Sequence, residues 1–150
     1  MSSDLPDTSA RHGPENLAIL LREPFRAMTD RLHERLAERG HPAIRHAHGA
    51  VFEWLDDDGT RVGVLAERAR MTKQSMAQLV EHLEAYGYVV RVPDPTDRRA
   101  RLVRTTPRGR AVFGVVRELI GEIDAELVAR LGPERIGTLR ALLADLRAAL

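Results

Sequence analysis

The 150-residue chain contains no cysteine. Disulfide bonds, thiolate metal sites and redox sensing through a thiol are therefore excluded. Aromatic residues are also scarce, at 4% against 43% hydrophobic residues, which suits helices packed through leucine, valine and alanine. No apolar run reaches the roughly 18 residues of a membrane span, and residues 1–13 lack the apolar core of a secretory signal. We expect a single cytoplasmic domain that does not enter a membrane.

Lysine occurs once, at Lys73, and the remaining positive charges are arginines. The net charge of +1 conceals an uneven distribution. Residues 61–110 carry eleven basic and five acidic side chains, a net charge of +6, whereas the rest of the chain has 12 basic and 17 acidic side chains. Such a concentration of positive charge indicates a polyanion as partner.

A helix-turn-helix is predicted between residues 62 and 87. Thr72 is a good N-cap for its second helix, and Gly87 ends that helix as a C-cap. Apolar positions at helical spacing form the buried faces: Leu65, Ala66 and Ala69, then Met76, Leu79, Val80 and Leu83. The side chains off the second stripe are of the kinds that contact base edges: Lys73, Gln74, Ser75, Ala77 and Gln78.

A β-hairpin is predicted to follow, with strands at residues 88–92 and 100–104 and a polar loop at 93–99 that contains two prolines. A helix-turn-helix followed by an arginine-tipped hairpin is typical of a winged helix-turn-helix, whose second helix enters the major groove of DNA. We expect Arg98 and Arg99 in or beside the minor groove, with Asp97 orienting the pair. Three further arginines are candidates for phosphate contacts, although strand alternation could turn the last two away: Arg68, Arg91 and Arg101.

Helices are also predicted on both sides of this element. The first runs from residue 14 or 15 to 39, with a kink or break at Pro24, and the second covers residues 43–55. A turn at 56–59 then leads into a short strand at 60–62. After the hairpin, Thr106 caps a helix to residue 130 or 131, Gly132 and Pro133 end it, and a last helix covers 134–150.

Catalytic and metal sites are poorly supported. Asp56, Asp57 and Asp58 are consecutive, but the spacing of a calcium loop does not continue. His46 and His48 point to different faces of a helix, so a zinc site near His41 would need Glu15 or His33 to complete it, an alternative that stays open. No nucleophile lies at a telling distance from a base, and no phosphate-binding loop occurs. We expect no enzyme, cofactor or metal.

The central region resembles the MarR family of bacterial transcription regulators. The matching segments are Leu65-Ala66-Glu67-Arg68, residues 83–89, the wing signature Asp97-Arg98-Arg99 and residues 102–109. With the flanking helices, the resemblance covers roughly residues 14–150. One departure is Gly63, where the family usually has a hydroxyl residue that caps the first helix; glycine is tolerated at an N-cap.

The resemblance implies a mainly α fold with a small β wing. In this view residues 1–13 are a disordered tail and 14–150 form one domain, with a winged helix-turn-helix lobe at 43–105. The N- and C-terminal helices at 14–40 and 107–150 would form a homodimer interface, although packing within one subunit remains the alternative. Family members often bind a small aromatic or anionic effector between the two regions, and the candidate lining residues here are His46, His48, Phe52 and Trp54.

We therefore expect a sequence-specific transcriptional regulator. It would bind a palindromic operator in double-stranded DNA as a homodimeric repressor, and a small molecule would release it. Two alternatives remain: a non-specific architectural DNA-binding protein, and a winged-helix protein-interaction module.

Overall fold

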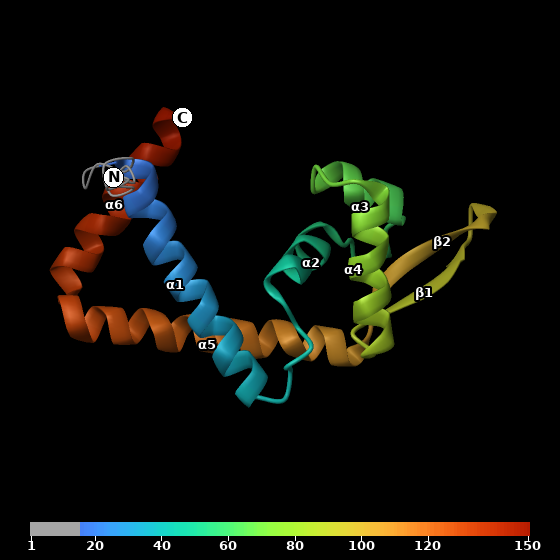
Figure 1. Cartoon of the computed structure of the whole chain (residues 1–150), viewed down its shortest axis with the longest axis horizontal. Helices are drawn as coiled ribbons and strands as arrows, with labels where there is room; N and C mark the ends of the chain where they lie inside the picture. The colour runs from blue at the N-terminus through green and yellow to red at the C-terminus, as the bar shows by residue number, and fades with distance from the viewer. Residues whose placement is uncertain (1–15) are drawn as a thin grey trace, which may run out of the picture.

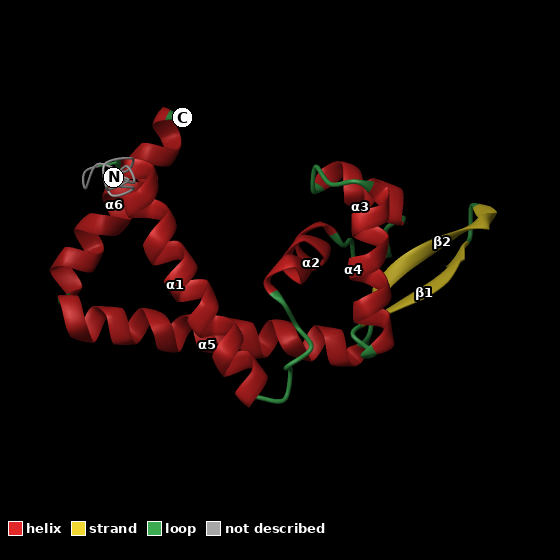
Figure 2. Ribbon diagram, viewed as in Figure 1, coloured by secondary structure: helices red, strands yellow, loops and turns green. Residues whose placement is uncertain are grey.

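The computed structural model describes residues 16–150, so the expected tail at residues 1–13 lies outside the described part. The fold is mainly helical with one two-stranded antiparallel sheet (Figure 2), as the sequence predicts. In chain order the elements are α1 Leu17–Glu38, the 3-10 turn η2 His46–His48, α2 Gly49–Trp54, α3 Val62–Arg68, α4 Lys73–Ala85, β1 Val89–Asp94, β2 Asp97–Thr105, α5 Pro107–Leu131 and α6 Pro133–Ala149.

Two groups of elements occupy opposite ends of the long helix α5 (Figure 1). At one end η2, α2, α3, α4 and the hairpin form a lobe, while at the other end α6 turns back from α5, and α1 crosses α5 between them. The best-buried side chains lie in the lobe: Val51, Leu65, Met76, Val80, Leu83, Tyr88 and Val103. Most of the core therefore lies in the lobe, and it continues to Leu36 of α1 and to Val112 and Leu119 of α5.

Helix α1 starts after Asn16, whose side-chain oxygen accepts the Ala18 backbone N–H at 2.9 Å. It continues through Pro24 as one helix, so of the predicted kink or break at this residue the break is wrong. Loss of one backbone hydrogen bond is tolerated within a helix of 22 residues. Among the α1 residues only Leu36 is buried. The apolar side chains of the first half, such as Leu21 and Phe25, border open hollows shared with α6 and α5 and stay partly exposed.

The second helix is shorter than predicted. Residues 43–45 are not helical; Arg45 has an extended backbone, and a 3-10 turn precedes α2. The Arg45 N–H donates to Nδ1 of His48 at 2.8 Å, and the His48 ring packs on His82 of α4. These contacts keep residue 45 out of the helix. The stack of His48 on His82 joins residues far apart in the sequence, so helical periodicity cannot predict it.

The helix-turn-helix agrees with its prediction except at its start. Thr72 caps α4 by accepting the Ser75 N–H at 3.1 Å, and Gly87 follows the helix with φ of 75°. Arg61, not Gly63, is the N-cap residue of α3, and it makes no side-chain cap bond. Gly63 lies within the first turn of α3, so the expected glycine cap is wrong.

The hairpin is longer than predicted, because the strands extend to Asp94 and from Asp97. Only Pro95 and Thr96 lie between them, so Arg98 and Arg99 belong to strand β2 rather than to a loop. The predicted third strand at residues 60–62 is reduced to one bridge between Thr60 and Val103, since α3 begins at residue 62.

Helix α5 begins and ends as predicted, with Thr106 accepting the Gly109 N–H at 3.1 Å and Gly132, at φ of 88°, separating it from α6. Helix α6 covers Pro133–Ala149, one residue earlier at each end than the predicted 134–150. Ion pairs join α5 to α1. Arg35 bonds Glu126, and Arg39 donates to Glu122 at 2.8 Å. The hydrogen bond from Arg35 lowers the pKa of Glu126 below its usual value. These ion pairs hold α1 against α5 at the point where the two helices cross.

Candidate nucleic-acid interface and central cavity

The first turn of α4 presents a polar surface. Its opposite side is anchored in the core by Met76 and Val80, both fully buried. The Thr72 hydroxyl also donates to Ser75 Oγ at 2.8 Å, which leaves the Ser75 hydroxyl hydrogen free to donate outward. The four residues that the sequence suggests for base reading are all exposed on this face: Lys73, Gln74, Ser75 and Gln78.

The wing tip is held by two aspartates. Asp94 Oδ1 accepts the Thr96 N–H at 2.8 Å and its hydroxyl at 2.7 Å, while Asp97 Oδ1 accepts the Arg99 N–H at 3.0 Å. Asp97 thus positions the Arg99 backbone; its other oxygen lies 3.8 Å from Arg61. Orientation of the guanidinium pair Arg98 and Arg99 by this carboxylate remains a hypothesis.

The arginines of the lobe fall into two groups. Arg61 pairs with Asp94, Arg91 with Glu84 at 2.9 Å, and Arg68 with Asp56 at 2.8 Å. Arg68 also donates to the Trp54 carbonyl, so it ties α3 to the end of α2, and any phosphate contact would use its remaining N–H groups. Within residues 16–150 no carboxylate pairs with three exposed wing arginines: Arg98, Arg99 and Arg101.

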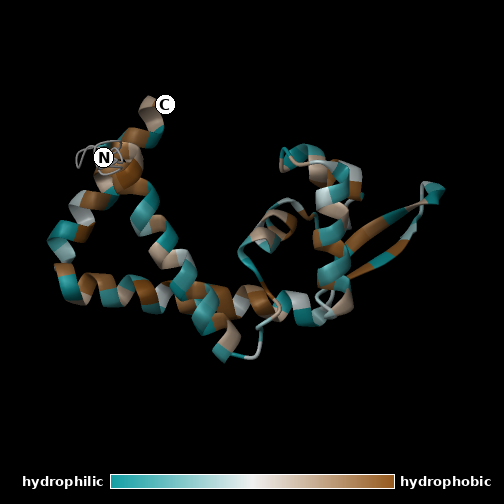
Figure 3. Ribbon diagram, viewed as in Figure 1, coloured by the Kyte–Doolittle hydropathy of each residue, from teal (hydrophilic) through white to brown (hydrophobic). Residues whose placement is uncertain are grey.

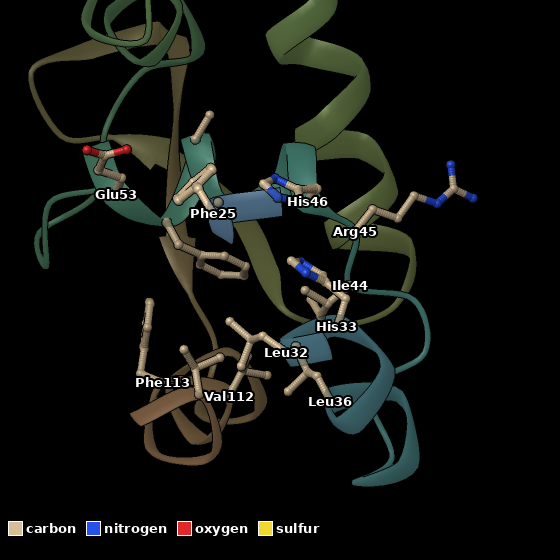
Figure 4. Close-up of a pocket in the computed structure, with 14 residues that line it drawn as sticks. Phe25, Leu32, His33, Leu36, Ile44, Arg45, His46, Glu53, Val112 and Phe113 are labelled. Atoms are coloured by element: carbon tan, nitrogen blue, oxygen red, sulfur yellow. The ribbon is translucent and has the colours of Figure 1, made fainter. Parts of the chain in front are cut away.

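A cavity of about 430 Å³ lies where α1, η2, α2 and α5 meet (Figure 4). Its walls are mainly apolar and include five rings, those of Phe25, Phe52, Phe113, His33 and His46. The His33 and His46 rings stack at 5.0 Å, and Phe52 meets Phe113 edge-on at 5.2 Å. Figure 4 shows the Arg45 guanidinium pointing away from the labelled apolar side chains. The cavity therefore offers ring faces and imidazole nitrogens rather than an inward arginine.

Two of the four candidate effector residues line this cavity, His46 and Phe52. His48 does not: it is 1% exposed, it stacks on His82 at 4.8 Å, and burial lowers its pKa to about 4 with help from the charges of His82 and Arg45. Trp54 lies at the exposed end of α2, also outside the lining. The sequence reading missed several lining residues on α1 and α5: Phe25, Leu32, His33, Val112, Phe113 and Val116. Helical spacing detects most of these as apolar or near-apolar positions but cannot show that they border a void.

Metal binding finds no geometric support. In the part of the chain that the structure describes, no three histidine or acidic side chains converge. His33 Nδ1 donates to the Thr29 carbonyl, and His41 Nδ1 hydrogen-bonds with the Tyr88 hydroxyl at 3.0 Å, so both histidines have other partners. Glu15 lies outside the described residues. Across residues 16–150 no helix has the length and apolar character needed to cross a bilayer.

The fold, the exposed polar face of α4 and the arginine-bearing hairpin define a winged helix-turn-helix protein of the DNA-binding class. Comparison with known proteins gives the family. A model of the MarR family matches residues 45–100. The chain is 30% identical over 115 residues to the transcriptional regulator HosA of Escherichia coli, covering 76% of this chain and 82% of HosA. The chain belongs to the MarR family of transcriptional regulators and, like its relatives, is not an enzyme.

Two further similarities support this assignment. The transcriptional activatory protein BadR of Rhodopseudomonas palustris is 38% identical over 80 residues, which is 50% of this chain and 46% of BadR, so the chain matches about half of that relative. The crystal structure of transcriptional regulator Tm0710 from Thermotoga maritima superposes with a TM-score of 0.66 at 27% identity, covering 88% of this chain and 92% of Tm0710.

Proposed function

We propose that this regulator is a homodimer that reads a palindromic operator with α4 and flanks it with the wing. The observation that carries the proposal is the first turn of α4. Its apolar side is locked in the core, its cap is complete, and its exposed side holds amide, hydroxyl and ammonium groups. A surface of this chemistry on a rigid helix fits direct readout of the major groove.

The dimer is supported by apolar surface at the end of the molecule far from the wing. A hollow of about 740 Å³ there is lined by α1 and α6. Figure 3 shows hydrophobic residues recurring along α5 and α6. The exposed side chains include Leu20, Leu21, Phe25 and Met28 of α1 with Leu139, Leu142 and Leu143 of α6. Monomeric proteins rarely leave such a contiguous surface uncovered, so we assign it to a second copy, related by the two-fold axis that a palindrome requires.

Base reading is assigned to Lys73, Gln74, Ser75 and Gln78, and groove or phosphate contacts to Arg98, Arg99 and Arg101. Fluorescence anisotropy with DNA from upstream of its own gene, against scrambled DNA, tests the proposal. Specific binding at least about 10³-fold tighter than scrambled binding is expected. Gln78→Ala should reduce this discrimination by about 1–3 kcal/mol. Arg147→Ala, on exposed α6, is the control; because α6 also lines the proposed dimer interface, its oligomeric state is checked first, and its discrimination should then equal that of the wild type.

Other results would support the alternatives. Equal affinity for both DNAs would indicate an architectural DNA-binding protein. Absence of salt-sensitive binding would indicate a protein-interaction module.

The oligomeric state is measured by sedimentation equilibrium, and Leu142→Asp should shift a dimer to monomer because it places a charge on the proposed interface. A monomeric wild type would refute the dimer.

Regulation is assigned to the central cavity. A small aromatic molecule would fit its ring-lined walls and would touch both the dimerisation helices α1 and α5 and the lobe elements η2 and α2. We assign the protein to the cytoplasm and its regulation to repression. BadR is named as an activatory protein, so the direction needs a reporter assay with and without the regulator. Val116→Trp should fill the cavity, and loss of ligand-induced DNA release in this variant is the expected result.

A further inference from the structure

The turn between α3 and α4 holds a residue with an unfavourable backbone conformation. Within residues 16–150, Arg70 is the only residue other than glycine with a positive φ, at 53°. In this left-handed region the Cβ of an L-residue crowds the following carbonyl oxygen, so residues with a long side chain are uncommon there. Strained residues of this kind cluster at functional positions.

The backbone hydrogen bonds of the turn explain the positive φ but not the arginine. The Arg70 N–H donates to the Glu67 carbonyl at 3.1 Å, and the Met71 N–H donates to the Ala66 carbonyl at 2.9 Å. This pair of bonds is the Schellman motif, which ends a helix and usually has glycine at the left-handed position. Both bonds are made by the main chain, so the turn needs a positive φ at residue 70 and no side chain.

Two other helices of the same chain end in the same way. Helices α1 and α4 each close with the same two hydrogen bonds, and the left-handed residues there are Gly40 and Gly87, with φ of 92° and 75°. The chain therefore uses glycine at two of these three helix ends. The exception, Arg70, lies in the turn of the helix-turn-helix.

The Arg70 side chain has no partner in the fold. Its neighbours Arg61 and Arg68 pair with Asp94 and Asp56. Arg70 is exposed, and within residues 16–150 its guanidinium makes neither a hydrogen bond nor an ion pair. No contact inside the described chain offsets the cost of the strained backbone, so a role for this side chain must come from a molecule outside the chain.

The place of Arg70 suits a phosphate of DNA. It lies two residues before Thr72, the N-cap of α4, and consecutive Cα atoms are about 3.8 Å apart, so the two Cα atoms are within about 8 Å of each other. The major groove is about 12 Å wide, so a residue this close to a helix end in the groove lies beside one of the bordering phosphate backbones. A planar guanidinium can donate two parallel hydrogen bonds to a phosphate.

We propose that Arg70 binds a phosphate of the operator beside the first turn of α4 and so positions this helix in the major groove. The inference rests on the proposed reading of DNA by α4. Phosphate contacts set the register of a protein on the duplex without reading its sequence. Arg70 thus differs in role from Gln78, which is assigned to base edges.

The variant Arg70→Gly tests the inference because it should change stability and DNA binding in opposite directions. Glycine relieves the strain, so the melting temperature at equal protein concentration should rise by about 2–4 °C. Affinity for DNA should fall roughly tenfold at about 0.1 M salt, and the slope of log affinity against log salt should fall by about 0.9 for each bound copy. DNA from upstream of the gene and scrambled DNA should be weakened by similar factors.

Two further variants serve as controls. Arg70→Lys keeps the charge and the strain, so it should retain most of the affinity and the salt slope without a gain in melting temperature. Arg117→Gln removes an exposed charge from α5 and should leave DNA binding unchanged. Thermal unfolding and fluorescence anisotropy across a salt series measure all three variants beside the wild type.

Three results would overturn the inference while leaving the proposed function intact, provided that the wild type binds DNA normally. Unchanged affinity and slope in Arg70→Gly would remove Arg70 from the interface. A fall in melting temperature together with affinity would show that the arginine serves the fold. Loss of binding to upstream DNA alone would indicate base reading instead of a phosphate contact. Absence of salt-sensitive binding by the wild type would refute the proposed function and this inference with it.

Discussion

The Arg61 guanidinium donates to one oxygen of Asp94, Oδ2, from both Nε and Nη2, at 2.7 and 2.6 Å. Arg61 is the N-cap residue of α3, and Asp94 ends β1, so this contact joins the helix-turn-helix to the wing. The wing otherwise extends from the lobe as a two-stranded ribbon (Figure 1). The ion pair thus helps to hold the wing against the helix-turn-helix.

Asp94→Asn should loosen the wing, because the neutral amide keeps the size of the side chain but loses the charge that holds Arg61. We expect weaker DNA binding with little change in helix content. Anisotropy titration and far-ultraviolet circular dichroism measure the two effects, with exposed Asp145→Asn of α6 as control. Unchanged affinity in Asp94→Asn would show that wing orientation does not need the ion pair.

The same carboxylate predicts an acid-dependent loss of stability. Hydrogen bonds from Thr96, and then the bond from Arg61, lower the pKa of Asp94 to about 2 from an ordinary value of 3.8. A lowered pKa stabilises the folded state above the ordinary value, and this stabilisation disappears as the pH falls from about 4 towards 2. Urea unfolding of the wild type should therefore weaken over this range more than that of Asp94→Asn. Parallel pH profiles would contradict the assignment.

Gly109 is predicted to be essential to the fold. A Cβ at this position would collide with the Tyr88 carbonyl, where the first turn of α5 passes the start of β1. Gly109→Ala should cost about 1–3 kcal/mol, the usual cost of overpacking. Gly114→Ala in the same helix meets open space, so it should instead stabilise by about 0.5–1 kcal/mol. Thermal unfolding compares the pair, and similar melting temperatures would refute the close approach.

Arg99 should contribute a measurable share of DNA affinity. If it neutralises one phosphate, Arg99→Ala lowers the slope of log affinity against log salt by about 0.9. If its guanidinium enters the minor groove, Arg99→Ala should also lower the affinity at moderate salt. The affinity lost should then exceed that caused by Arg147→Ala, which removes a surface charge far from the wing. An unchanged slope together with unchanged affinity would remove Arg99 from the interface.

Local signals explain which features could be predicted from sequence. Thr72, Gly87, Thr106 and Gly132 mark helix boundaries through hydrogen bonds and backbone angles within a few residues, and each was located correctly. The buried face of α4 was also predicted correctly, because the spacing of its apolar residues along the helix is itself a local signal.

Features that depend on distant contacts were not predictable in the same way. The 3-10 turn before α2 is held by His48 packing on His82, 34 positions away, and the wing strands gain length by pairing with each other across the Pro95-Thr96 turn. The central cavity is a void between helices, so periodicity identified its apolar neighbours without showing that they face it. His48 is a candidate effector residue through the family resemblance, and the structure shows it as a buried residue of the core instead.

His48 provides the last prediction. Its burial, with the charges of His82, Arg45 and His33 adding to it, lowers its pKa to about 4 from 6.5. The unfolded chain therefore binds a proton between these values that the folded chain does not, and stability must fall as the pH is lowered through this window. The limiting slope for one such group is roughly 1.4 kcal/mol per pH unit.

His48→Asn retains an acceptor for the Arg45 N–H and does not titrate, so its free energy of unfolding should change less with pH between pH 6.5 and 4 than that of the wild type. Urea unfolding at intervals of half a pH unit measures both profiles, with exposed His46→Asn as the matched control. Equal slopes for wild type and His48→Asn would mean that His48 takes up its proton in the folded state, and that the stack with His82 tolerates the charge.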